Sequence, residues 1–400
     1  MPQPNRLRVL IAGGGVAALE ALLALRALAG ARVHVTLLAP EREFVVRAAT
    51  VGEPFDRAPG RRLSLCDIAA EQEAELVRGR LDSVETEARL VHTDEGITLT
   101  YDVLVVALGA VPTEPLPGAV TFRGRSDVGE MRFLLEDLDA RRIRSVVFAL
   151  PRTLAWPVPL YELALMTAAR VFGHGVTRAD LTVVTPEPEP LGVFGPAGSR
   201  AMRRLLREHR VALRAGTRPE RVEDGALVLA DGTRVPANRV VTVPVLEGRR
   251  IPGLPGDAHD FIPVDRHGRV RGVGGVYAAG DITNFPLKQG GLAAQQADAV
   301  AEAIAARAGA LVTPEPFRPI IRGLVMTGAE PLYLRAEPGS ASGPGTPLAV
   351  VPSAFDESDR PLWWPPAKLA GRYLAPYLAT ARPTRSAEAT LVDRPAAPSR

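Results

Sequence analysis

The chain has 400 residues with a formal net charge of +3 at pH 7, and 46% of its residues are hydrophobic. This length predicts two or three globular domains with ample apolar surface to bury. The basic residues lie in stretches of mixed charge without a long basic run, which excludes nucleic acid as an expected partner. The one cysteine, Cys66, excludes an internal disulfide and a thiolate metal cluster, so no metal site is predicted. We expect Cys66 to be a small packed side chain.

The amino-terminal residues resemble neither a signal peptide nor a membrane span. Residues 1–6 lead directly into a predicted strand, and no run of about twenty apolar residues follows in the chain. The expected location is therefore the cytoplasm, without a transmembrane segment.

The first predicted unit is a strand, a glycine turn, a helix and a second strand. Residues 8–12 and 33–38 read as strands, and the helix between them ends before Gly30. The turn has the spacing Gly-x-Gly-x-x-Ala, with Gly13 for the turn, Gly15 for close approach to a pyrophosphate and Ala18 for helix–sheet packing. This pattern predicts dinucleotide binding.

Four further features are expected in the rest of the first 118 residues. An acidic residue is expected about twenty residues on, at the end of the second strand, where the chain has Ala39 and then Glu41 two places later. Glu41 either contacts the ribose or lies outside it, and Arg47 either approaches the cofactor or forms a structural salt bridge. A helix is expected over residues 68–76. Residues 101–112 read as a buried strand that ends at Gly109, where the main chain can pass close to a ligand.

A second α/β unit begins with a strand over residues 144–150, where a second phosphate loop would be expected. The chain instead has a proline-rich segment over residues 151–159 that contains no glycine. Prolines remove amides that would otherwise donate to a pyrophosphate, so the usual nicotinamide site is predicted to be lost. Further along, a strand over 181–185, a helix over 199–210 and a hairpin over 222–235 are expected.

The most informative stretch is residues 274–296, which reads as a buried strand, a turn at Gly280 and a helix that starts past Gln289. Asp281 follows the strand, so it either accepts hydrogen bonds from ligand hydroxyls or serves as a turn residue. Lys288 precedes the helix, and 46 of the 48 basic residues are arginine, which makes a lysine here notable. The alternative for Lys288 is a solvated loop residue.

The carboxyl-terminal region contains a predicted strand pair over 322–335, a flexible loop over 339–345 and an aromatic segment over 362–378 with Trp363 and Trp364. That segment suits a lid, a homodimer or protein-partner contact, a peripheral membrane contact or plain packing. Residues 381–400 lack apolar periodicity and are expected to be a disordered tail.

The three ordered motifs, Gly13-x-Gly15-x-x-Ala18, Ala107-Leu108-Gly109 and Tyr277-Ala-Ala-Gly280-Asp281, resemble the FAD-dependent pyridine nucleotide–disulfide oxidoreductase superfamily. Within it, residues 285–291 and the aromatic segment look most like the branch that includes sulfide:quinone oxidoreductases. Those enzymes use paired cysteines, whereas this chain has only Cys66. The resemblance therefore does not extend to cysteine redox chemistry.

The resemblance implies an α/β fold with two Rossmann-like (doubly wound) domains, one binding FAD and one a degenerate NAD-binding-like domain, plus a small carboxyl-terminal region. The implied domains are residues 1–118 and 257–313 for FAD, 119–256 for the second Rossmann-like domain, 314–380 for an interface or lid, and 381–400 for the tail. FAD is the implied cofactor. Its implied contacts are Gly13, Gly15, Val16, Ala17, Ala18, Ala39, Glu41, Arg47, Leu81, Ala107, Gly109, Gly280, Asp281, Lys288, Gln289 and Gly290.

The predicted function is an FAD oxidoreductase that passes two electrons from an unidentified donor to a quinone, oxygen or a protein, with Lys288 and the adjacent helix favouring negative charge on the flavin. Trp156, Tyr161, Trp363 and Trp364 are the candidate pocket residues for a small-molecule substrate or quinone. One alternative is an NAD(P)H-dependent reductase of the type II NADH dehydrogenase or ferredoxin reductase kind. The other is a non-catalytic flavin-binding subunit.

Overall fold

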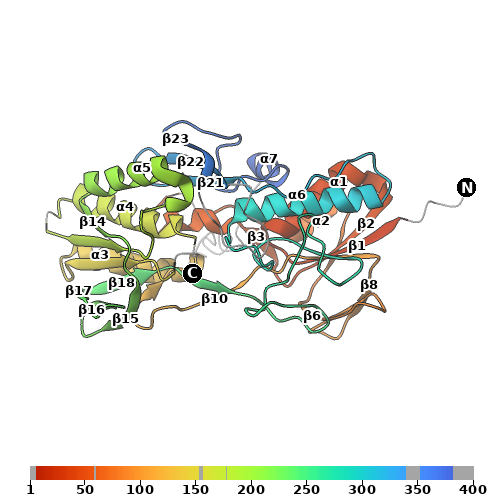
Figure 1. The fold of residues 1–400 in the computed structure, drawn as a ribbon, viewed down its shortest axis with the longest axis horizontal. Helices are drawn as coiled ribbons and strands as arrows, with labels where there is room; N and C mark the ends of the chain where they lie inside the picture. Colours follow the sequence, from red (N-terminus) through yellow and green to blue (C-terminus); the bar gives the residue numbers. More distant parts are fainter. Residues whose placement is uncertain (1–5, 58–59, 153–155, 177, 339–351, 382–400) are drawn as a thin grey trace, which may run out of the picture.

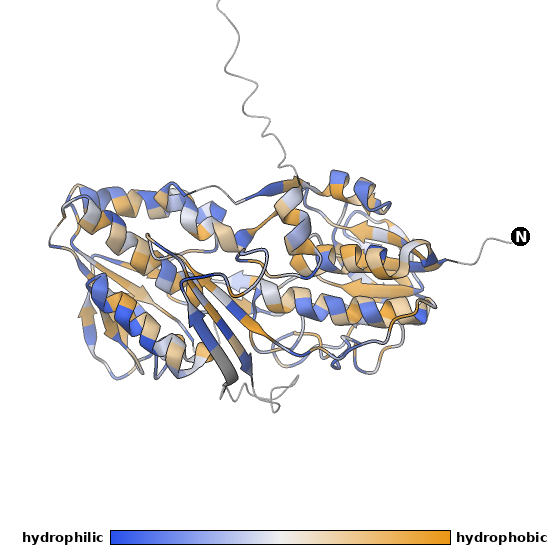
Figure 2. Cartoon of the chain, turned by 90° about the horizontal axis from the view of Figure 1, so that it is seen from above, coloured by the Kyte–Doolittle hydropathy of each residue, from blue (hydrophilic) through white to orange (hydrophobic). Residues whose placement is uncertain are grey.

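The computed structural model describes residues 6–57, 60–152, 156–176, 178–338 and 352–381. Two α/β units lie side by side along the long axis of the molecule (Figure 1), and each is built on its own five-stranded parallel sheet. The strands of these sheets are short apolar runs, and Figure 2 shows them mostly in the hydrophobic colour. Such runs form strands that are covered on both faces.

The first sheet has the strand order β20-β9-β1-β2-β5, so it joins segments from both ends of the described chain. Helices α1 and α6 cover one face and contact each other, and the small antiparallel sheet β6-β7-β8 covers the other. The bounds are β1 (Leu7–Ala12), β2 (Val33–Leu38), β5 (Glu75–Val77), β9 (Val103–Val106), β20 (Val276–Ala278), α1 (Val16–Ala29), α6 (Gly290–Arg307), β6 (Leu81–Glu85), β7 (Leu90–Thr93) and β8 (Thr98–Thr100).

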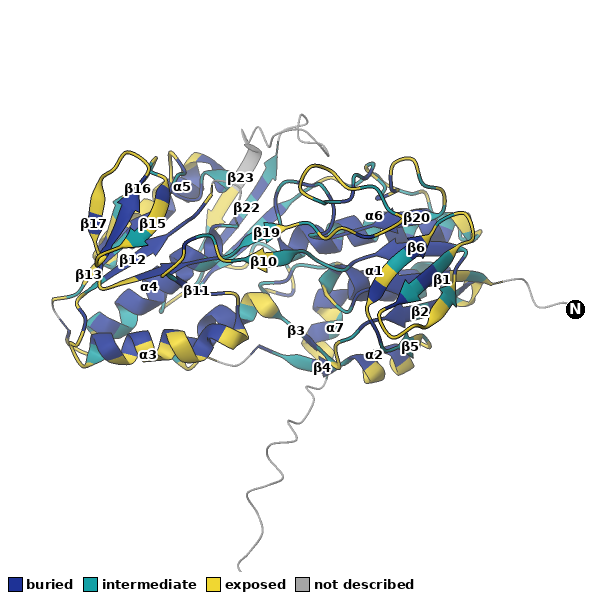
Figure 3. Ribbon diagram, turned by 90° about the horizontal axis from the view of Figure 1, so that it is seen from below, coloured by how far each residue is buried: buried dark blue, intermediate teal, exposed yellow. Residues whose placement is uncertain are grey.

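The second sheet has the order β11-β18-β12-β13-β14 and packs against α3, α4 and α5 on one side and the antiparallel sheet β15-β16-β17 on the other. Figure 3 shows that α3 is exposed along one side and buried along the other. The bounds are β11 (Val120–Thr121), β12 (Ser145–Ala149), β13 (Asp180–Val184), β14 (Val211–Arg214), β18 (Arg239–Thr242), α3 (Val128–Asp139), α4 (Val158–Gly173), α5 (Gly195–Glu208), β15 (Pro219–Glu223), β16 (Ala226–Leu229) and β17 (Arg234–Pro236).

Three small sheets connect or cover these units. Strands β10 and β19 pair antiparallel where the chain passes from one unit to the other and back, β3 pairs with β4, and β21-β22-β23 packs its apolar side on the second unit. Helix α7 packs on α1. The bounds are β3 (Glu43–Val45), β4 (Arg62–Ser64), β10 (Val111–Thr113), β19 (Val245–Glu247), β21 (Ile321–Val325), β22 (Leu332–Pro338), β23 (Pro352–Ser358), α2 (Leu65–Glu71) and α7 (Leu374–Thr380), with 3₁₀ segments η1 (Gly30–Arg32), η2 (Arg47–Phe55), η3 (Arg125–Asp127) and η4 (Gly192–Phe194).

Several expected boundaries are corrected. The helix expected over 68–76 is α2 (Leu65–Glu71), because the Ser64 hydroxyl caps it by accepting from Asp67 N and Glu73 has a positive φ of 48° that ends it. The hairpin expected over 222–235 is present as β16 and β17, which pair antiparallel, and β15 precedes it as a third strand of the same sheet. The helix expected over 199–210 begins earlier, at Gly195, with a proline in its first turn.

Two expectations fall on parts of the chain that are not described. The predicted loop over 339–345 lies outside the described residues, as does the predicted tail over 381–400 except for Ala381. None of the helices in the described part of the chain has the length and apolar character needed to span a membrane.

Candidate functional site

The turn after β1 needs glycine at Gly13 and leaves open space at Gly15. Gly13 has a φ of 130°, and a Cβ there would lie 2.3 Å from the carbonyl oxygen of Ala107. At Gly15 a Cβ would meet no atom within 4 Å, and Gly15 is also the N-cap of α1. The first amides of α1 therefore open onto unfilled space, which fits the diphosphate of a dinucleotide.

A second helix begins next to this turn. Gly280, at the end of β20, has a φ of 84°, and a Cβ there would lie 3.1 Å from the Cβ of Ala17 on α1 and 3.4 Å from that of Ala293 on α6. Small residues at these positions bring the amino termini of α1 and α6 together, as the packing of Ala18, fully buried in α1, also requires. Two helix amino termini and one strand end converge here, and this favours a ligand with negative charge.

The opposite edge of the turn is formed by the end of β2. Ala39 is fully buried, and Oε2 of Glu41 lies 3.2 Å from the position of a Cβ on Gly14. The Arg78 guanidinium donates to the main-chain oxygen of Glu41. Sequence reasoning missed Arg78, although its place directly after β5 was a signal. Ribose contact by Glu41 stays a prediction.

Two more predicted contacts, Leu81 and Gly109, do not present a side chain to a cofactor. Leu81 is only 7% exposed and its side chain packs into the core between the first sheet and β6-β7-β8, so only its main chain is available to a cofactor. Gly109 has a φ of 70°, and a Cβ there would meet nothing within 4 Å. Gly109 thus leaves room beside the turn.

Asp281 lies where three distant segments meet. It accepts a hydrogen bond from the main chain of Gln289, and burial raises the pKa of its carboxyl, while the charges of Lys288 and Arg47 act in the opposite direction. The Gln296 side chain, which sequence reasoning missed, accepts a 2.7 Å hydrogen bond from Gly280 N and holds this turn. The structure therefore brings Arg47, Asp281 and Lys288 into one electrostatic cluster; their contacts to FAD stay predictions.

Lys288 is half-buried rather than a solvated loop residue. Its ammonium donates to the carbonyl oxygen of Thr283 and lies 3.7 Å from the ring centroid of Phe261. Burial lowers the pKa of Lys288 to about 8, against the opposing charges of Asp281 and Asp257. A lysine with this pKa can carry or release a proton near neutral pH.

The amino terminus of α6 is built from Gln289 and covered by the carboxyl-terminal segment. The Gln289 side chain caps the helix by accepting from Leu292 N at 2.9 Å, and it donates to the main-chain oxygen of Arg322 at 2.9 Å. A Cβ at Gly290 would lie 3.2 Å from Cδ1 of Leu369. Sequence reasoning missed Arg322 and Leu369, because nothing local in the chain signals these long-range contacts.

The end of β13 in the second unit is closed by the protein's own side chains. The Tyr161 hydroxyl on α4 donates a 2.7 Å hydrogen bond to Oε2 of Glu187, and the Thr185 hydroxyl donates to the same oxygen at 3.0 Å. Burial raises the pKa of the Glu187 carboxyl. In a dinucleotide-binding unit an acid at this strand end contacts a ribose. Here the Glu187 carboxylate already accepts hydrogen bonds from Tyr161 and Thr185.

The four aromatic residues expected to line one pocket make separate contacts instead. Trp156 packs edge-on against Phe194 in the second unit, and Tyr161 is fully buried. Trp363 packs against Tyr333, whereas Trp364 is 87% exposed. The prediction of a shared pocket was wrong because helix α4 turns Tyr161 into the core.

The expectation that Cys66 is packed was also wrong. Cys66 is exposed, because α2 turns its neighbours Leu65 and Ile68 into the core instead. In the described residues, no group of three or more His, Cys, Asp or Glu side chains is placed to hold a metal ion.

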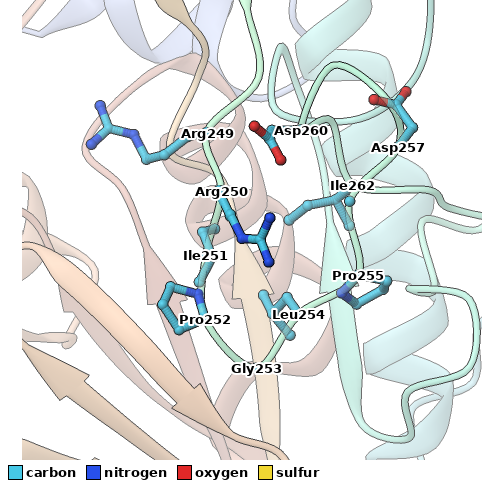
Figure 4. A pocket seen from close by; sticks show the side chains of 11 residues that line it. Arg249, Arg250, Ile251, Pro252, Gly253, Leu254, Pro255, Asp257, Asp260 and Ile262 are labelled. Atoms are coloured by element: carbon cyan, nitrogen blue, oxygen red, sulfur yellow. The ribbon is translucent and has the colours of Figure 1, made fainter.

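A cavity of about 210 Å³ lies along the segment that returns to the first unit, residues 249–262 (Figure 4). Figure 4 shows the Arg250 side chain turned into this loop and Arg249 turned away from it. None of the predicted cofactor contacts lines the cavity. Its connection to the site is indirect, through Asp257, which also acts on Lys288.

The chain matches the family model described as pyridine nucleotide-disulphide oxidoreductase over residues 7–147 and 162–306. It is 27% identical over 326 residues to the benzene 1,2-dioxygenase system ferredoxin–NAD(+) reductase subunit of Pseudomonas putida, covering 74% of each chain. It is 25% identical over 308 residues to the sulfide-quinone reductase of Aquifex aeolicus, covering 70% of this chain and 71% of that protein.

Among solved structures, the chain is similar to the sulfide:quinone oxidoreductase from Aquifex aeolicus, with a TM-score of 0.76 and 20% sequence identity over 88% of this chain and 86% of that one. This likeness confirms the fold of two Rossmann-like domains. The open glycine turn and the two converging helix amino termini fit FAD. The chain therefore belongs to the pyridine nucleotide-disulphide oxidoreductase family and is an FAD-dependent oxidoreductase.

Proposed function

We propose that the protein transfers two electrons from a donor other than NAD(P)H to a quinone, without cysteine chemistry. The observation that supports this most is the hydrogen bond between Tyr161 and Glu187, which occupies the carboxylate where a nicotinamide cofactor's ribose would be held. The glycine-free segment after β12 removes the other half of that site. The relative named sulfide-quinone reductase supports the quinone.

FAD supplies the two-electron chemistry when it is bound. The chain's own residues have three tasks: the glycine turn approaches the diphosphate, Asp281 accepts hydrogen bonds from hydroxyl groups, and the Lys288 charge with the α6 amino terminus favours negative charge nearby. The C-terminal segment that carries Leu369 covers the α6 amino terminus and excludes water from that side.

A buried acid–base pair next to this cover suits an acceptor that takes up protons with its electrons. The Lys368 ammonium lies 2.5 Å from Oε1 of Glu162, which is fully buried and also accepts from Met326 N at 2.8 Å. Burial lowers the pKa of Lys368 and raises that of Glu162. Lys368 precedes Leu369, so the pair can supply a proton to a quinone held there.

A second candidate is a ferredoxin reductase that accepts electrons from NAD(P)H. It is favoured by the similarity to the ferredoxin–NAD(+) reductase subunit of the benzene dioxygenase system. In this case nicotinamide would have to bind without the usual second site, and a protein would replace the quinone. Both candidates are compatible with a cytoplasmic protein, which is part of the proposal.

An anaerobic titration of the FAD-loaded protein with NADH and then NADPH separates the two candidates. We expect the flavin bands near roughly 450 nm to persist, and the dithionite-reduced protein to be reoxidised faster by a short-chain ubiquinone analogue than by a [2Fe–2S] ferredoxin. Rapid bleaching by either nicotinamide would overturn the proposed donor class. Faster reoxidation by ferredoxin would replace the quinone with a protein acceptor.

A further inference from the structure

Strand β21 runs past the candidate site and is held by hydrogen bonds near both of its ends. Near its start, the Gln295 side chain on α6 accepts from Ile320 N at 2.8 Å, and Gln289 donates to the main-chain oxygen of Arg322. Just after its end, Met326 N donates to the buried Glu162. The middle of β21 therefore spans the distance between the α6 amino terminus and Glu162 on α4.

The two faces of β21 have different surroundings, because successive side chains in a strand point to opposite sides. Ile321 and Val325 are fully buried in the core of the second unit, and a Cβ at Gly323 would lie 2.6 Å from the Phe194 ring. Arg322 is on the other face. Met326, which follows in the same alternation, has its Cε 3.2 Å from the position of a Cβ on Gly52 in η2.

Segment η2 begins at Arg47, whose charge acts on Asp281 in the candidate site. The face of β21 that carries Arg322 and Met326 is thus the one that borders η2, through Met326. Its third boundary is the carboxyl-terminal segment, because Trp363 packs on Tyr333, a residue of the same face on β22.

The Arg322 guanidinium is half-buried, and its hydrogen bonding is incomplete. Its Nε is buried without a hydrogen-bond partner. The negative charge that favours its charged form is that of Glu337, which also pairs with Arg335. Its cross-strand neighbour is another arginine, Arg335. Arg335 is itself balanced by Glu337 and by Asp356 at 3.4 Å.

Burial and the charge of a neighbouring residue both disfavour the charged form of Arg322. Burial is the main cause of the lowered pKa of Arg322, and the positive charge of Arg335 adds to it, whereas Glu337 opposes the shift. A buried Nε–H without an acceptor is destabilising, and the planar donors of a guanidinium match two oxygens of one carboxylate. A bound anion would remove that penalty.

We propose that Arg322 holds a carboxylate group of the small-molecule electron donor, between η2, β21 and the segment that carries Trp363. This inference rests on the proposed function in one respect, that a small molecule reacts beside Gln289 and Lys288. It adds the chemical class of that molecule and assigns Arg322 as a specificity-determining residue.

The test uses the full-length, FAD-loaded protein with benzoate as the probe and benzamide as its neutral counterpart. Binding is followed by isothermal titration and by the change in the flavin visible spectrum. We expect benzoate to bind and benzamide to bind at least about tenfold more weakly, since charge-assisted hydrogen bonds provide that difference. Arg322→Gln should weaken benzoate binding by about tenfold or more.

Arg335→Gln is the matched control, because Arg335 lies on the same face but is already paired with carboxylates. It should leave the benzoate affinity within about twofold, and both variants should stay folded and keep the FAD content of the wild type. A wild-type protein that fails to bind benzoate, an unchanged affinity in Arg322→Gln, or a larger loss in Arg335→Gln would overturn the inference. A protein that is bleached by NADH but still binds benzoate through Arg322 would overturn only the proposed donor.

Discussion

The hydroxyl of Tyr161 and the carboxylate of Glu187 form a 2.7 Å hydrogen bond between residues that are 26 positions apart, on α4 and after β13. Both side chains are buried. Glu187 occupies the position where a dinucleotide-binding unit presents its ribose-binding acid. The acid at this strand end of the second unit is therefore part of the core.

Replacing Tyr161 with phenylalanine should lower the free energy of unfolding by about 1–3 kcal/mol, because the buried Glu187 loses a donor. It should not create NADH binding, since the segment after β12 still lacks glycine. Urea unfolding and NADH titration measure the two effects. Tyr377→Phe is the control: Tyr377 also donates to a carboxylate, that of Glu71, but at the surface, so its loss should be below about 1 kcal/mol. Equal losses in both variants would contradict the structural role of the buried bond.

The glycines of the first turn should respond differently to substitution. Gly13→Ala should destabilise the fold by at least about 1–3 kcal/mol, because φ is 130° and the Cβ would meet the Ala107 oxygen. Gly15→Val should leave the apoprotein folded, because a Cβ there meets no protein atom within 4 Å, and should abolish retention of FAD. Retained FAD in a folded Gly15→Val protein would remove this turn from the cofactor site.

Lys288→Met should keep FAD bound but lower its reduction potential, because a nearby positive charge is lost. A loss of about 1.4–2.8 kcal/mol corresponds to roughly 30–60 mV for a two-electron couple. Dye-linked equilibration at pH 7 measures this shift. Lys288→Arg keeps the charge and is the control; its potential should stay close to that of the wild type.

The same lysine predicts a pH effect. The Lys288 ammonium loses its proton as the pH rises through its pKa of about 8, so the gap in potential between the wild type and Lys288→Met should close above that pH. A gap that is constant from pH 6.5 to about 9 would mean that the Lys288 charge does not act on the cofactor.

A buried carboxyl pair at the start of α7 predicts pH-dependent stability. Glu20 on α1 accepts hydrogen bonds from Tyr373 N at 2.7 Å and Leu374 N at 2.9 Å, and burial followed by the charge of Glu20 raises the pKa of Asp298 to about 8. Arg372 and Glu302 also face Asp298, with opposite effects on its pKa. Between these two pKa values, 3.8 for an unfolded aspartate and about 8 in the folded state, the folded protein keeps a proton on Asp298 that the unfolded chain has released.

Because the folded state binds more protons between these two pKa values, the free energy of unfolding should fall as the pH rises through this window. Asp298→Asn should flatten that decline and stabilise the protein near pH 8 by on the order of 1 kcal/mol or more. Urea unfolding between pH 5 and about 9 gives the comparison. Glu302→Gln, on the same helix, should change the decline much less, because the Glu302 charge is the smallest of the named contributions to the pKa of Asp298. A decline that persists unchanged in Asp298→Asn would show that this pair does not govern it.

The elements that are determined by residues close together in the sequence could be predicted from the sequence alone. The strand from Leu7, the glycine turn and the start of α6 after Gln289 all follow from local propensity, φ preferences and the spacing of small residues. These motifs, in their order, were enough to identify the fold and the cofactor, because a βαβ turn that approaches a diphosphate leaves little freedom in residue choice.

Contacts between distant segments were decided only by the tertiary structure. Lys368 pairs with Glu162 across 206 positions, and Gln289 reaches the carbonyl of Arg322 across 33. Tyr161 was expected in a pocket and Cys66 in the core, and both expectations were wrong. Periodicity tells which residues share a face of a helix but not which neighbour that face meets. The partner of each face depends on how the two sheets, α6 and the carboxyl-terminal segment pack together, and that packing also brings Arg322 to the border of the site.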